Sequence, residues 1–402
     1  MAEERTFDWA SGLQLLGSLV GVLVLIGVSV AGTLVISLEK GEWFVAVSTV
    51  QTTSLILFFA SLGFVGILLI PSVLYAAKRI LGTSSGKEMS WHWAGWLIVL
   101  FPVFLGLGYL ADWETGAGRF LLAISHVSAN GVAVFWILNL GRKGLPKGSA
   151  QRFWGVFGSG MTLAPALALL FEFLLLVLIG GIWYAYLVQH PALRDQITHL
   201  VERLPQSAAS PAILERMANK YLFNPGILAS VFSYVAVLIP LVEELIKPLG
   251  LWLLMRRKLT PVQGFTLGMV SGAGYALFEN LTLSANANTW TVVMISRFGT
   301  TAVHMLTTGF VGWGLASTWS EGSYARLAKA FLTSVVFHGV WNGLNILGAL
   351  GQFSGAREAF GPFGYWMAQY APVGLFILAV GAIYGLLRSN RFLRRAIMSQ
   401  VE

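Results

Sequence analysis

The sequence of 402 residues contains no cysteine and few charged residues. Without cysteine, disulfide bonds, thiolate catalysis and cysteine-ligated zinc or iron–sulfur sites are excluded. Asp, Glu, Lys and Arg make up only 11% of the chain, against about 25% in a typical soluble domain. Apolar residues reach 56%, which excludes both a water-soluble globule and a disordered chain. The composition therefore predicts a membrane protein.

Long apolar runs fill most of the chain. A helix needs about 20 apolar residues to cross the hydrocarbon core of a bilayer. We expect an all-α, polytopic membrane protein with about ten spans, at 13–38, 53–77, 93–111, 120–140, 161–188, 227–255, 262–285, 290–316, 330–350 and 367–387. The first run is too long for the core of a signal peptide, so we expect it to be retained as a span.

Basic residues cluster in alternate connections between these runs. With the N-terminus placed inside, 17 Lys and Arg fall in the inner connections and seven in the outer ones. The positive-inside rule then predicts a multi-pass protein of the plasma (inner) membrane with both termini cytoplasmic. The same bias accounts for the net charge of +8, so we expect contact with the lipid bilayer and no nucleic-acid partner.

Ionisable residues within the apolar runs are concentrated in the second half of the chain. The first five runs contain only Glu172 and His126, each alone, for which we favour a local hydrogen bond. The next four contain Glu243, Glu244, Lys247, Glu279, Arg297, His304 and His338. A charge near the centre of a membrane helix costs about 2.5–3.5 kcal/mol. We therefore expect these groups to share a polar cavity, with a purely structural ion-pair network as the alternative.

The run 227–255 carries the densest of these motifs. Pro240 and Pro248 lie on either side of the segment from Glu243 to Lys247, so we expect the helix to be kinked or partly unwound there. Lys247 follows Glu243 by four residues and Glu244 by three, so its ammonium can meet either carboxylate. The paired carboxylate would stay ionised, and the other would be suited to act as a general base for water.

The following runs carry further motifs at helical spacing. Small residues recur every fourth position from Gly264 to Ala276, which predicts close helix packing that brings Glu279 toward the run 227–255. Polar residues share one helix face in each of the next two runs: Arg297, Thr301, His304 and Thr308 in the first, and His338, Asn342 and Asn345 in the second. Two histidines flanked by polar residues favour a shared cavity over isolated core positions.

The order of these motifs resembles the PrsW-type glutamic intramembrane endopeptidases, related to the CAAX-processing and bacteriocin-processing (CPBP) membrane proteases. The resemblance covers about 227–350 and rests on Glu243-Glu244-x-x-Lys247, Tyr275-x-x-x-Glu279-Asn280, Arg297 with His304, and His338-x-x-Trp341-Asn342. It implies hydrolysis of membrane-anchored protein or peptide substrates by water that a glutamate activates. Tyr275 stands where the family usually has phenylalanine.

The resemblance also implies a role for each motif residue. Glu243 would be the general base, Glu244 its partner and Lys247 the counter-ion. Glu279 occupies a position where the wider group often has histidine, and His304 would position the water or protonate the leaving amine. His338 and Asn342 would stabilise the oxyanion. We expect the substrate to contact Tyr275, Asn280 and Arg297.

The chain then divides into four regions. These are an N-terminal five-helix membrane region at 1–188, an extracytoplasmic amphipathic loop at 189–225, a catalytic core of four helices at 226–350, and a C-terminal helix with a basic cytoplasmic tail at 351–402. The loop carries apolar residues at helical spacing. It would either border the mouth of the substrate cavity or form a distant cap.

Two alternatives remain open. Histidines and glutamates could hold zinc with an open coordination position, but HExxH is absent and Lys247 would repel a cation, so we expect no cofactor and keep zinc as the less favoured possibility. Intramembrane Glu, His, Lys and Arg also build the relays of secondary transporters and channels. Transporters usually have matching broken helices in both halves, and the first half has no counterpart of Glu243 or His304.

Overall fold

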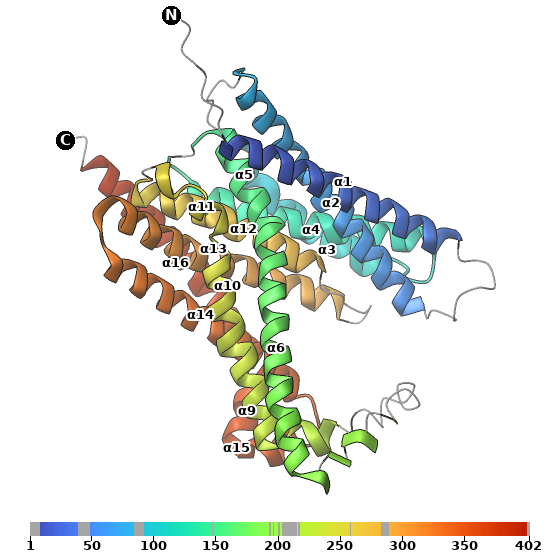
Figure 1. Ribbon diagram of the computed structural model, residues 1–402. Helices are drawn as coiled ribbons and strands as arrows, with labels where there is room; N and C mark the ends of the chain where they lie inside the picture. Colours follow the sequence, from blue (N-terminus) through green and yellow to red (C-terminus); the bar gives the residue numbers. More distant parts are fainter. Residues whose placement is uncertain are drawn as a thin grey trace, which may run out of the picture. The chain divides into compact units, whose positions relative to one another are not determined.

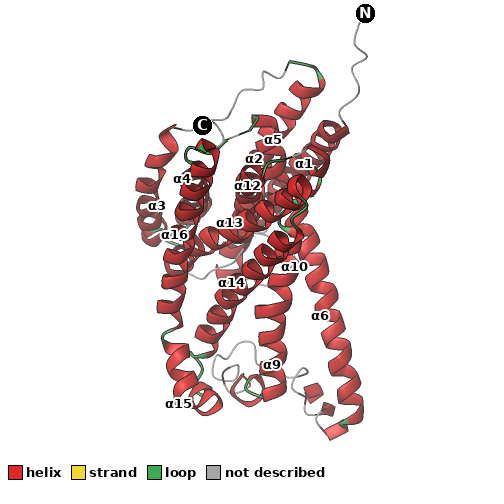
Figure 2. Cartoon of the chain, turned by 90° about the vertical axis from the view of Figure 1, so that its left-hand side faces the viewer, coloured by secondary structure: helices red, strands yellow, loops and turns green. Residues whose placement is uncertain are grey.

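The computed structural model describes residues 9–38, 49–83, 92–146, 148–192, 194–195, 197–199, 202, 215, 218–257, 259–282 and 289–399. Within these ranges the chain is helical and contains no β-strand (Figures 1 and 2). This confirms the all-α prediction. The expected amphipathic loop at 189–225 lies largely outside the described residues.

The helices follow the apolar runs closely. The first half contains α1 (Trp9–Leu38), α2 (Thr49–Ile80), the 3-10 helix η1 (His92–Val99), α3 (Leu100–Leu110), α4 (Gly116–Arg142), α5 (Ala150–Met161) and α6 (Leu163–Gln189). The second half contains η2 (Ala218–Leu222), α9 (Pro225–Ser233), η3 (Tyr234–Leu238), α10 (Ile239–Ile246), α11 (Leu249–Trp252), η4 (Met255–Arg257), α12 (Pro261–Thr282), α13 (Trp290–Glu321), α14 (Tyr324–Leu350), α15 (Ala356–Gln369) and α16 (Ala371–Met398).

Seven segments among the described residues are long and apolar enough to cross a membrane. They are Trp9–Ile36, Thr52–Ile80, Gly116–Arg142, Ala150–Gln189, Pro225–Trp252, Tyr324–Leu350 and Ala371–Met398. The chain is therefore an integral, multi-pass membrane protein. The expected spans at 93–111, 262–285 and 290–316 correspond to η1 with α3, to α12 and to α13, and these helices are not among the seven. The count of about ten spans and the cytoplasmic placement of both termini stay predictions.

The described chain forms two compact units. The first unit comprises 1–166, 244–334 and 379–402, and the second comprises 167–243 and 335–378. The boundaries fall inside helices α6, α10, α14 and α16, so these helices contribute to both units. The four predicted sequence regions divide the chain differently and stay a prediction.

Close packing of α12 against α13 organises the first unit. A Cβ atom built on Gly268 would lie 2.3 Å from the backbone oxygen of Thr308, and one on Gly272 would lie 2.6 Å from that of His304. Only glycine allows the two backbones this approach. The predicted small-residue stripe therefore packs as expected, and it places the α12 residue Glu279 beside His304.

A π-helical turn shapes the second unit ahead of the paired glutamates. Pro240 has no N–H to donate to Ala236, and the chain widens into η3, in which the N–H of Ile239 donates to the oxygen of Tyr234. The oxygen of Ala236 faces Gly339 of α14, where a Cβ would lie only 2.3 Å away. Pro240 and Gly339 together thus bring α14 against η3. The expected distortion near Glu243 is present as this π turn.

The second proline ends α10. Lys247 and Pro248 form a turn between α10 and α11, both of which are helical. The backbone oxygen of Lys247 accepts a hydrogen bond from the hydroxyl of Ser271 on α12. The break therefore fixes Lys247 to a neighbouring helix, and the side chain of Lys247 extends from this fixed point.

Candidate active site

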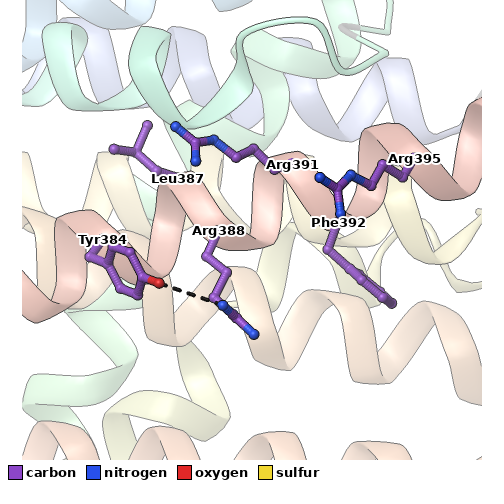
Figure 3. Close-up of a pocket in the computed structure, with 6 residues that line it drawn as sticks. All are labelled: Tyr384, Leu387, Arg388, Arg391, Phe392 and Arg395. Atoms are coloured by element: carbon purple, nitrogen blue, oxygen red, sulfur yellow. Dashed lines mark hydrogen bonds between the residues drawn. The ribbon is translucent and has the colours of Figure 1, made fainter.

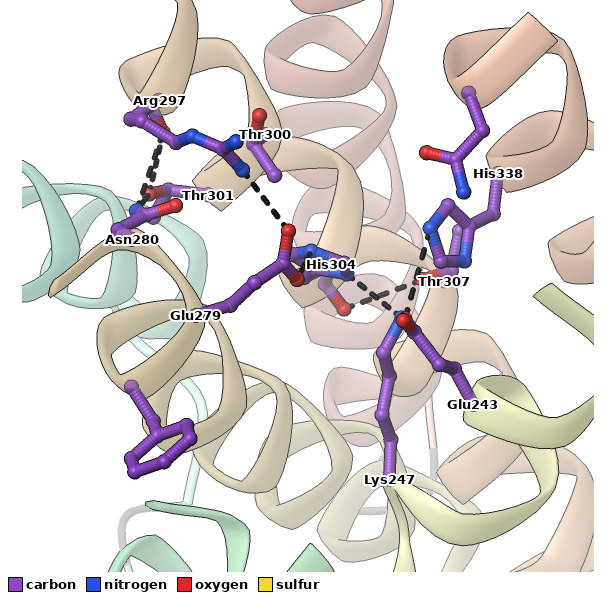
Figure 4. A network of polar contacts seen from close by, with 12 residues as sticks. Glu243, Lys247, Glu279, Asn280, Arg297, Thr300, Thr301, His304, Thr307 and His338 are labelled. Carbon is purple, nitrogen blue, oxygen red and sulfur yellow. Dashed lines mark hydrogen bonds and ion pairs between the residues drawn. The ribbon is translucent and has the colours of Figure 1, made fainter. Parts of the chain in front are cut away.

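A chain of ion pairs runs through the first unit, from α10 to α13 (Figure 4). The ammonium of Lys247 donates to Oε1 of Glu244 at 2.8 Å and lies 2.7 Å from Nδ1 of His304. On the other side of the imidazole, Nε2 of His304 lies 2.8 Å from Oε2 of Glu279. Arg297 donates to the second oxygen of Glu279 at 2.9 Å. Five ionisable side chains thus form one continuous series.

The neighbours of His304 determine the tautomer of its ring. An ammonium has no acceptor, so Nδ1 must accept the hydrogen bond from Lys247. Nε2 then carries the proton and lies 2.8 Å from Oε2 of Glu279. The imidazole is neutral in this assignment, and two carboxylates balance two cations. Charge balance explains how the series tolerates burial, since Glu244 and Lys247 are fully buried.

Further side chains hold the series in place. The hydroxyl of Thr307 donates to the Glu244 oxygen that Lys247 also contacts, at 3.1 Å. The Tyr275 ring lies beneath the ammonium of Lys247, 4.9 Å from ring centre to nitrogen, and packs edge-on against His304. A cation over an aromatic face is stabilised by the ring's negative potential. These contacts place Tyr275 against Lys247 and His304, and its expected contact with substrate stays a prediction.

Asn280 and Arg297 join α12 to α13. The amide of Asn280 donates to the hydroxyl of Thr301 at 2.9 Å and more weakly to the backbone oxygen of Arg297 at 3.4 Å. Asn280 is fully buried, whereas the side chains of Arg297 and Glu279 are 18% and 30% exposed. The series is therefore most accessible at Glu279 and Arg297.

The second unit holds the other expected site residues. Oε2 of Glu243 lies 3.7 Å from Nε2 of His338, and both side chains are nearly buried. One N–H of the Asn342 amide donates to the backbone oxygen of Val235 in η3, at 3.2 Å. The π turn thus orients Asn342, which lies one helical turn after His338 on α14.

Glu243 and Glu244 contact different partners. They are consecutive residues of α10, and their side chains point about 100° apart around the helix. Glu244 joins the ion-pair series of the first unit, and Glu243 pairs with His338 of the second. Of the two carboxylates that the spacing allowed, Glu244 is the one that the structure pairs with Lys247.

His126 lies apart from these contacts. Its Nδ1 accepts a hydrogen bond from the indole of Trp290 at 3.3 Å, and its Nε2 lies 3.2 Å from the backbone oxygen of Leu281. Both ring nitrogens therefore have partners in the core, which agrees with the expected local hydrogen bonding. Thr307 and Ser271 were not expected at the site. Thr307 follows His304 by three residues, a helical spacing that could have revealed it, whereas Ser271 has no such signal.

One family model matches the chain, over residues 206–380. Its family is PrsW, described as intramembrane metalloproteases. The match includes every expected site residue and confirms the similarity to the PrsW family. The wider relationship to CPBP proteases stays a prediction. No curated protein and no solved structure matches the chain.

The PrsW match supports one part of the expected function. It supports a membrane-embedded peptide hydrolase, and it lends nothing to the transporter alternative. The family is described as metalloproteases, whereas the sequence led us to expect a metal-free, glutamate-activated water. The family description and the sequence-based expectation thus differ on whether a metal ion takes part.

Proposed function

We propose that this protein is an intramembrane endopeptidase that cleaves membrane-anchored proteins or peptides, with water activated by Glu243. The observation that carries the proposal is the buried, charge-balanced series from Glu244 to Arg297 within the PrsW-like region, with Glu243 next to it in the chain. Packing alone rarely requires so many ionisable groups at membrane depth.

The different partners of the two glutamates support this division of roles. Oε1 of Glu244 accepts hydrogen bonds from both Lys247 and Thr307, and the ammonium holds this carboxylate ionised. A carboxylate stabilised in this way is a weak base. Oε2 of Glu243 lies 3.7 Å from Nε2 of the His338 imidazole. Glu243 is therefore the better candidate to take a proton from water.

In this proposal His338 and Asn342 stabilise the oxyanion. The bond from Asn342 to Val235 uses one of its two amide hydrogens, and the second can donate to a developing negative charge. Donors held in a fixed orientation are an effective means of transition-state stabilisation in a site that excludes water. His304, with its proton on Nε2, would orient the water or donate to the leaving amine once Nε2 exchanges Glu279 for that partner.

The substrate would approach from the bilayer. Of the three residues expected to contact it, Tyr275 and Asn280 are buried and Arg297 is partly exposed. We therefore propose that Arg297 makes the substrate contact and that the other two position Lys247 and α13. Each backbone polar group of a peptide at membrane depth needs a partner, and the guanidinium of Arg297 can donate to a substrate carbonyl.

A metal-dependent variant of the same hydrolysis has one supporting observation. Zinc ligands in a tetrahedral site lie roughly 3.4 Å from one another, given Zn–N and Zn–O bonds of about 2.0–2.2 Å. The 3.7 Å between Glu243 and His338 is close to this spacing, so the pair fits two positions of such a site. Zinc would need a third ligand. His304 has the right chemistry, although Lys247 and Glu279 already bond its two nitrogens. Bound zinc would supply Lewis-acid activation of water.

Cleavage products test the proposal directly. The purified protein would be placed in proteoliposomes with candidate membrane-anchored substrates, and the products would be identified by mass spectrometry. New peptide termini that depend on the protein are expected. Ion or solute flux without any cleavage would favour the transporter alternative, and binding without either would indicate an inactive scaffold.

A further inference from the structure

A row of arginines lies on one face of α16, in the first unit and away from the ion-pair series. A pocket of about 280 Å³ opens along this face, lined by Tyr384, Leu387, Arg388, Arg391, Phe392 and Arg395 (Figure 3). The three arginines follow one another at spacings of three and four residues, so their side chains project from the same side of the helix. All three are exposed.

This face of α16 is held in a fixed position by the opposite face. The amide of Asn390 donates to the backbone oxygens of Gly141 and Lys143, at 2.8 and 2.9 Å. Asn390 is nearly buried, and it closes the C-terminal end of α4. A helix anchored in this way presents its arginines as a preformed set, which lowers the entropy cost of binding a ligand.

Negative charge is scarce around these arginines. From Ala359 to Val401 the sequence contains no Asp or Glu. The ion pairs among the described residues do not include Arg388, Arg391 or Arg395. Arg388 donates a long hydrogen bond of 3.5 Å to the hydroxyl of Tyr384. Guanidinium groups bind phosphate oxygens in a bidentate manner. The row is therefore suited to an anion of the phosphate type.

The other half of the pocket is apolar and faces outward. The side chains of Tyr384 and Phe392 are 59% and 67% exposed, and they belong to a helix long and apolar enough to cross a membrane. The arginines follow the apolar part of that helix, where a span leaves the hydrocarbon core. Inorganic phosphate would use only the basic half of the pocket, whereas a phospholipid has an acyl chain for the apolar half.

We propose that this face of α16 is a binding site for an anionic phospholipid, with the headgroup phosphate on Arg388, Arg391 and Arg395 and an acyl chain along Tyr384, Leu387 and Phe392. On the topology that the positive-inside rule predicts, this end of α16 would meet the cytoplasmic leaflet, where anionic lipids attract basic segments. The site is independent of peptide hydrolysis and does not require it.

Native mass spectrometry of the detergent-purified protein tests the site. Phosphatidylglycerol and phosphatidylcholine with the same acyl chains would be titrated separately, and inorganic phosphate would be added as a competitor. The test variant is Arg388→Gln/Arg391→Gln. The matched control is Arg326→Gln/Lys329→Gln, which removes two exposed positive charges from α14 outside the pocket.

We expect tighter binding of phosphatidylglycerol than of phosphatidylcholine. The test variant should weaken phosphatidylglycerol binding about 30-fold, since each basic residue near an anionic lipid contributes about a factor of five. The control should stay within about twofold of the unmodified protein. Arg391→Lys, which keeps the charge but loses bidentate geometry, should give an intermediate loss.

Three results would overturn the proposal. Equal losses in the test and control variants would indicate attraction by overall charge, without a site. Displacement of the lipid by millimolar inorganic phosphate would indicate a simple anion site. Unchanged binding in a test variant that retains its melting temperature would place the lipid elsewhere.

Discussion

The ammonium of Lys247 lies 2.7 Å from Nδ1 of His304, and this contact determines the protonation of the imidazole. Because Nδ1 accepts, Nε2 carries the hydrogen, and Nε2 lies 2.8 Å from Oε2 of Glu279. The same ammonium neutralises Glu244. Lys247 thus contacts both Glu244 and His304, and Glu279 lies on the other side of the His304 ring.

Substitution of Lys247 tests this connection. Lys247→Met leaves the carboxylate of Glu244 buried without its cation, which we expect to cost about 3–5 kcal/mol of folding free energy. The double variant Glu244→Gln/Lys247→Met removes both charges and should recover a large part of that loss. Thermal unfolding of the three proteins in the same detergent gives the comparison. Additive losses in the double variant would contradict the pairing.

The contact between α12 and α13 can be tested at a single glycine. In Gly268→Ala the new methyl group would lie 2.3 Å from the oxygen of Thr308, so the helices must separate. We expect a loss of roughly 1–3 kcal/mol in stability, together with reduced cleavage because His304 and Glu279 move apart.

The matched control is Gly180→Ala in α6, where a Cβ would meet nothing within 4 Å. This variant should melt at or slightly above the temperature of the unmodified protein, since alanine favours helix over glycine. A similar loss of stability in both variants would mean that helix packing at Gly268 is not the cause.

Metal dependence separates the two forms of the proposed mechanism. If Glu243 is the base, prolonged dialysis against a chelator should leave cleavage unchanged, and the active protein should contain no stoichiometric zinc by elemental analysis. If cleavage is lost on chelation and restored by zinc, the reaction requires the metal, and Glu243 and His338 are the first candidates for its ligands. In that case His338→Ala should also abolish zinc binding.

Much of the helical architecture was predictable from the sequence. The apolar runs were long and well separated, and the Gly264–Ala276 stripe has a strict four-residue period that predicts close packing. The π turn was harder to foresee. Pro240 signals a distortion, but whether the chain kinks, unwinds or widens depends on the neighbour that meets the released oxygen of Ala236, and that neighbour is Gly339 from a distant part of the sequence.

Side-chain partners were less predictable than helices. The spacing around Lys247 allowed a pair with Glu243 or Glu244, and only the rotation of α10 relative to α13 selects Glu244. The same rotation brings Thr307 to Glu244, although the sequence pattern had placed Thr308 on the polar face. The catalytic roles of Glu243, His338 and Asn342 stay proposals, because hydrogen-bond partners in a resting structure do not identify the group that takes the proton.

The activity of Glu243→Gln measures the central claim most directly. Glutamine keeps the size of the side chain but cannot accept a proton from water, so cleavage of a membrane-anchored substrate should fall below about 1% of the unmodified rate while substrate binding and melting temperature are retained. Glu172→Gln makes the same change at the lone glutamate of α6 and should keep full activity. Full activity of Glu243→Gln, or its loss in Glu244→Gln alone, would contradict the assignment of Glu243 as the base.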